Sequence, residues 1–195
     1  ANLYPLPNRN LRGQNFTGTP TQRDRNDRFN IKIDQSVGLA GTFTARYSFA
    51  DRDLFEPYAA ASFSSVPGFG NDVPERGQNF MLGETHALGV NWINEFRFGF
   101  NRTASATFHQ NRGRSLNREV GLPDFATRDR DLGLSFINVT GFSSLGDEFN
   151  NPQDSTVNGY QLLDTLSYAR GNHLLQFGLE RRWLGQDAYR DVQAR

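Results

Sequence analysis

The chain has 195 residues, with 21 basic and 21 acidic side chains, no cysteine, and an aromatic content of 13% that includes 17 Phe. So many aromatics argue against a disordered chain, cancelling charges lead us to expect no nucleic-acid partner, and the lack of cysteine excludes disulfides and Cys-ligated metals. No run approaches the roughly 18 apolar residues of a membrane helix, so helical membrane spans are also excluded.

Residues 1–27 carry three prolines and two glycines among polar side chains, which predicts an extended loop. No charged-then-apolar leader opens this stretch, and we expect the chain to begin inside a longer protein. Alternation of apolar and polar side chains starts over 28–34 and returns over 42–49. Because only a short connection separates these two strands, they are predicted to form a hairpin.

The polar stretch 51–77 is predicted as a long loop with one possible short strand at 58–63. Alternation resumes over 78–88 and 91–108, which form the second predicted hairpin. A tight turn therefore joins these two strands, and the next long loop follows the second of them.

The stretch 109–156 is the longest predicted loop, and a third hairpin pairs 159–169 with 173–189. Tight turns therefore alternate with long loops, as in membrane barrels with short periplasmic turns and longer extracellular loops. A tilted membrane strand needs about 9–11 residues, and the fourth and sixth segments exceed that length. We therefore predict an all-β fold, namely the antiparallel up-and-down strands of a transmembrane β-barrel, present as a partial barrel of six to seven strands.

Successive side chains of a strand point to opposite faces, so each strand has one apolar and one polar side. In NWINEFRFGFNR (91–102) the aromatic residues alternate with charged or small ones. We expect the apolar set to face lipid: Phe29, Ile31, Ile33, Phe43, Tyr47, Phe96, Phe98, Phe100, Leu175 and Phe177. We expect the polar set to face the lumen: Asn30, Lys32, Thr44, Arg46, Glu95, Arg97, Asn101, Gln176, Glu180 and Arg182. Cross-strand charge pairing is the simplest role for the polar set.

Three polar residues share the apolar face: Glu84, His86 and Asp164. An acid at the bilayer midplane is costly, but each of these lies about five residues before a tight turn, near the depth where the penalty falls. We expect them at the membrane interface or at a local bulge.

No motif predicts a catalytic, cofactor-binding or metal site. His86, His109 and His173 have no second ligand at a helical metal-site spacing. Asp129 and Asp131 lack the other ligands of a calcium loop. We therefore expect no enzymatic activity and no cofactor.

Several segments, in order over nearly the whole chain, resemble the barrel of Oar-like TonB-dependent outer-membrane receptors. They are NLYPLPN (2–8), DRFNIKIDQS (27–36), GTFTARYSF (41–49), LGETHALGVNWINEFRFGFNR (82–102), GLPDF (121–125) and YQLLDTLSYARGNHLLQFGLERR (160–182). The resemblance implies a place in the cell outer membrane, a plug and a carboxypeptidase-regulatory-like domain before the barrel, and TonB-energised movement of a large ligand.

The chain contains no stretch like a TonB box or a plug, and the smallest bacterial barrels already need eight strands. We therefore expect 1–195 to be a single segment of an outer-membrane barrel domain, with unpaired edges near 29–33 and 173–185. Its expected partners are outer-membrane lipid, the remaining strands and plug of the parent barrel, the TonB complex through regions outside this chain, and an unidentified transported ligand.

Two other functions fit the same alternation. One is a secreted soluble β-sandwich that binds carbohydrate or protein through its loops. The other is an extracellular hydrolase, which would need two carboxylates that converge in one cleft.

Overall fold

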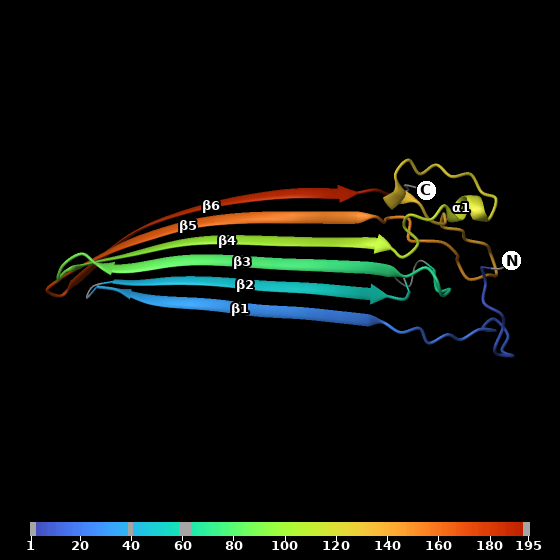
Figure 1. The fold of residues 1–195 in the computed structure, drawn as a ribbon, viewed down its shortest axis with the longest axis horizontal. Coiled ribbons are helices and arrows are strands. Elements are labelled where there is room, and N and C mark those ends of the chain that lie inside the picture. Colours follow the sequence, from blue (N-terminus) through green and yellow to red (C-terminus); the bar gives the residue numbers. More distant parts are fainter. Residues whose placement is uncertain (1–2, 39–40, 59–63, 193–195) are drawn as a thin grey trace.

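The computed structural model describes residues 3–38, 41–58 and 64–192, and its strands form one antiparallel sheet (Figure 1). Two short helical elements, α1 (Leu116–Glu119) and the 3-10 turn η1 (Asp129–Asp131), lie between the fourth and fifth strands. No helix among the described residues has the length and apolar character needed to cross a membrane. The strands are β1 (Arg23–Val37), β2 (Gly41–Glu56), β3 (Asn71–Ala87), β4 (Trp92–His109), β5 (Gln153–Arg170) and β6 (His173–Arg190).

Each strand pairs only with its neighbours in sequence, so the order across the sheet is β1-β2-β3-β4-β5-β6. The predicted all-β fold of antiparallel up-and-down strands is confirmed, with six strands. The sheet is not closed, and β1 and β6 are its edges. A β-sandwich requires a second sheet packed on the first, and the described residues form only this one. The alternative of a soluble β-sandwich therefore does not fit this fold.

The tight turns lie at one end of the sheet, and the long connections lie with both termini at the other end (Figure 1). We call these the turn end and the loop end. Gly171 has a φ of +58°, a conformation that suits glycine, where β5 turns into β6.

The strands have 15 to 18 residues, and β1, β2, β3 and β5 are longer than the alternation predicts. The loops predicted at 51–77 and 109–156 are shorter in the structure, where they span 57–70 and 110–152. Both faces of these extensions carry polar side chains, so no period of two is visible. Cross-strand pairs stabilise them instead, such as Arg76 with Asp51 at 2.8 Å. Except for Tyr58, the possible strand at 58–63 lies outside the described residues.

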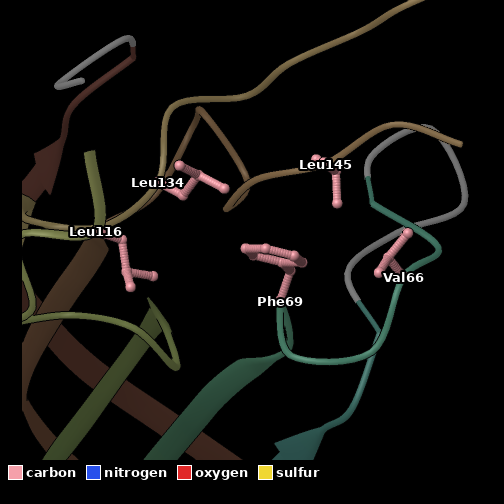
Figure 2. Close-up of a cluster of buried hydrophobic side chains, with 5 residues drawn as sticks. All are labelled: Val66, Phe69, Leu116, Leu134 and Leu145. Carbon is pink, nitrogen blue, oxygen red and sulfur yellow. The ribbon is translucent and has the colours of Figure 1, made fainter. Parts of the chain in front are cut away.

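The buried apolar cluster of the molecule lies in the loops and not on the sheet. Val66, Leu116, Leu134 and Leu145 surround the ring of Phe69 (Figure 2). On the edge strands, by contrast, Phe177 and Leu179 expose 60% and 73% of their surface. The apolar side chains of the sheet are thus exposed, and the described part of the chain does not cover them.

Candidate functional site

The strand register sorts the side chains of the sheet into two sets. One row across the sheet joins Ile31, Tyr47, Phe80, Phe100, Tyr160 and Trp183. We call this side the apolar face. All ten residues predicted to face lipid belong to it. Aromatic rings of this face contact one another across strands, as in Phe29 with Phe49 at 5.3 Å between centroids and Phe100 with Tyr160 at 5.0 Å.

The opposite side, the polar face, carries all ten residues predicted to face the lumen. Several of them pair across strands. Thr44 donates a 2.7 Å hydrogen bond to Asp34, and Gln161 donates a 2.8 Å bond to Glu180. Such pairs suit a wet surface, where each contributes about 0.2–1 kcal/mol. The lumenal role of this face stays a prediction.

The apolar band drifts across the sheet. On β1 it centres on Ile31, which shares a row with Trp183 of β6. On β6 the band runs from Leu175 to Trp183 and centres on Leu179, four residues nearer the turn end than Trp183. Four residues over five strand steps give roughly 2.6 Å of rise per 4.8 Å step, a tilt of about 30°. Strands of closed barrels tilt by about 35–45°, so the tilt of this sheet is somewhat smaller than that of a closed barrel.

The drift corrects the expected depth of Asp164. On β5 the apolar stretch runs from Tyr160 to Tyr168, and Asp164 lies at its centre rather than at its edge. Pairing on both sides of Asp164 is continuous, so there is no bulge. Its partner is Asn94, which donates a 2.7 Å hydrogen bond to the carboxylate.

Glu84 and His86 lie on β3 between Leu82 and the turn end. The pairing of this part of β3 is also continuous, which excludes a bulge there. The interfacial depth of these two side chains stays a prediction.

At the loop end, residues 64–71, 109–117 and 131–151 fold into a compact unit that we call the loop cap. The loop cap also contains a network of buried polar side chains. Asn71 donates a 2.7 Å hydrogen bond to Glu148, and Asn111 donates a 2.9 Å bond to Asp147. The Asp147 carboxylate also accepts the Leu134 backbone N–H at 2.7 Å. Because buried polar groups are costly when unpaired, these bonds fix the loops in place.

The fully buried side chain of His109 lies 3.7 Å from Asp147. Gly133 allows this packing, because a Cβ there would collide with the Asp147 carboxylate and lie 2.9 Å from His109 Cε1. The sequence offered no signal for the cap, since its asparagines and aspartates follow no period and their partners lie far apart in the chain.

Asp131, weighed above as a calcium ligand, instead accepts a 2.8 Å hydrogen bond from Arg128. This bond raises the pKa of the Arg128 guanidinium above its ordinary value. No group of three or more His, Cys, Asp or Glu side chains with the arrangement of a metal site occurs among the described residues.

A family model described as an outer membrane beta barrel domain matches residues 1–195. The chain belongs to this outer-membrane β-barrel family. No curated protein matches the chain, and no solved structure does. The predicted location in the outer membrane is thereby confirmed, and lipid surrounds the barrel domain to which the chain belongs.

Membership in this barrel family explains the open apolar face, because a barrel wall in a bilayer turns its apolar side to lipid. It also explains why the strands are longer than the apolar band. About 9–11 residues suffice to cross the membrane, so the strands of this barrel domain continue beyond it at the loop end. There, polar pairs occur on both faces: Arg76 with Asp51 on one, and Arg52 with Asp24 at 2.8 Å on the other.

Proposed function

We propose that this barrel domain forms part of the wall of a TonB-dependent, Oar-like outer-membrane transporter that moves a large ligand across the outer membrane. The domain has no enzymatic activity in this proposal. The ordered resemblance of segments such as 27–36, 82–102 and 160–182 to Oar-like receptors supports it.

The single observation that carries the proposal is the character of the two sheet edges. Edge strands of soluble proteins are usually protected by charge, bulges or a covering segment. On β1, Ile31 and Ile33 alternate with Asn30 and Lys32 as regularly as residues do on the inner strands, and β6 behaves likewise. Both edges are thus suited to further strands, and wide barrels enclose a channel or a plugged lumen.

The polar face supports the same function. Charged side chains such as Arg97, 59% exposed, and Glu95, 44% exposed, lie only 3.7 Å apart on β4. A wet lumen tolerates such charges and offers hydrogen bonds to a plug or to a polar ligand.

The test uses the full-length protein extracted from outer membranes. Immobilised periplasmic domain of TonB should capture it, and a trimeric porin from the same membranes should pass through as the control. In planar bilayers the protein should conduct no steady current, because a plug fills the lumen of such transporters. Failure of capture together with a steady open-channel current would contradict the proposal.

A further inference from the structure

An open hollow of about 650 Å³ lies over β3, β4 and β5, on the loop-end side of the aromatic row that contains Phe100. Ten of its thirteen lining residues belong to the same alternate set as Phe100, so the hollow opens on the apolar face. The hollow forms because the side chains there are small. Ala104, Ala106 and Thr156 line it, whereas larger residues such as Phe100 occupy the same face nearer the turn end.

Arg102 is a charged lining residue of this hollow that forms no ion pair with a described residue. It is the next residue of the apolar face after Phe100, and it donates a 3.4 Å hydrogen bond to Asn158. Among the described residues, no carboxylate lies within ion-pair distance of Arg102. Each of the other charged lining residues has an opposite partner: Asp51 with Arg76 at 2.8 Å, Glu75 with Arg52 at 3.5 Å, and Asp154 with Arg130 at 3.4 Å.

The depth of the hollow matches that of lipid headgroups. Phe100 and Tyr160, 5.0 Å apart, mark the loop-end limit of the apolar band on their strands. Aromatic rings of barrels gather at the membrane interface, and an arginine just beyond them extends its charge into the headgroup layer. With the long loops outside the cell, this layer belongs to the outer leaflet.

We propose that the hollow binds the phosphorylated headgroup of an outer-leaflet lipid, with the Arg102 guanidinium on the phosphate and an acyl chain of the same lipid along Phe100. A guanidinium has five N–H donors in a fork that fits phosphate with two parallel bonds. The bond to Asn158 leaves most of these donors available. Arg102 is also the charged lining residue that no described carboxylate neutralises, whereas each lining carboxylate already has an arginine partner, so a lipid phosphate finds its cationic partner at Arg102. The site requires the barrel domain alone and is independent of transport.

The experiment measures the binding of diphosphoryl lipid A, and of the same lipid after dephosphorylation, to the full-length protein by native mass spectrometry in mild detergent. The wild-type protein should bind the phosphorylated form more tightly. Arg102→Gln should weaken its binding by about tenfold or more, the effect of one lost charge-assisted bond. Arg97→Gln is the matched control, because it removes the same charge from the polar face of the same strand and should leave binding unchanged.

A second variant tests the hollow itself. Ala104→Leu fills it while Arg102 is retained, and it should also weaken binding of the phosphorylated lipid. Folding of every variant is checked by the heat-dependent gel mobility of barrels. Equal binding of both lipids by the wild-type protein, or unchanged binding in Arg102→Gln or in Ala104→Leu, would overturn the proposal. If Arg102→Gln fails to fold, the comparison of the two lipids and Ala104→Leu decide.

Discussion

Asn94 donates a 2.7 Å hydrogen bond to Asp164 on the neighbouring strand, at the centre of the apolar stretch of β5. Phe96 and Leu179 lie directly opposite Asp164 on the two adjoining strands. A carboxylate surrounded by lipid and apolar side chains loses its hydration, and a hydrogen bond recovers part of that loss. Asn94 and Asp164 therefore act as a pair.

The first prediction follows from this pairing. Asn94→Leu removes the side chain that donates to Asp164 and should lower the free energy of unfolding by about 1–3 kcal/mol. Adding Asp164→Leu should recover most of the loss, because the double variant leaves neither member of the pair as an unpaired polar group. Urea unfolding of the full-length protein in lipid vesicles measures both changes. Additive losses in the double variant would contradict the pairing.

The second prediction contrasts two neighbours on β4. Phe98 pairs with Leu82 and Leu162 in the apolar band, so Phe98→Arg should cost roughly 2–4 kcal/mol, the penalty for Arg at the bilayer midplane. Arg97→Gln on the polar face should cost about 0.2–1 kcal/mol. Folding into vesicles measures both. Trp92→Lys, near the interface, is the control, and a lysine there should be tolerated because it can snorkel. Severe losses at Phe98 and Trp92 alike would contradict a lipid-facing surface.

The faces of the sheet could be predicted because lipid and water impose a period of two on the residues between them. The strand ends could not, since beyond the membrane both faces are wet: Asp51 and Arg52 are neighbours on opposite faces and both form ion pairs. The depth of Asp164 depends on strand tilt, which is a property of the whole sheet and not of β5 alone. The loop cap depends on contacts such as Asn71 with Glu148, and nothing local in the sequence indicates them.

The third prediction concerns the loop cap. Gly133→Ala places a methyl group against Asp147 and His109, and such overpacking costs about 1–3 kcal/mol. Limited proteolysis should then cut within 110–152 faster than in the wild type, while the heat-dependent gel mobility of the barrel stays the same. Gly185→Ala on β6 is the matched control, since its Cβ would meet no atom within 4 Å. Equal cutting rates in all three proteins would exclude the proposed role of Gly133.

The fourth prediction concerns orientation in the outer membrane. The chain has no cysteine, so a single one can be introduced as a probe. Phe142→Cys lies in the long loop 110–152 and Val90→Cys in a tight turn, and both native side chains are well exposed, at 66% and 100%. An impermeant maleimide added to intact cells should label the loop site alone, because barrels place their long loops outside. Labelling of the turn site alone would contradict this orientation, because it would place the tight turns outside the cell.

The central claim is that the apolar face of this sheet meets lipid. The most direct measurement places a fluorescent label on single cysteines at each position from 95 to 100 of the full-length protein, folded into vesicles whose acyl chains carry bromine quenchers. Quenching should alternate, strong at the positions of Phe96, Phe98 and Phe100 and weak between them, because successive strand residues point to opposite faces. Uniform quenching along the segment, or an alternation with the opposite phase, would contradict the account.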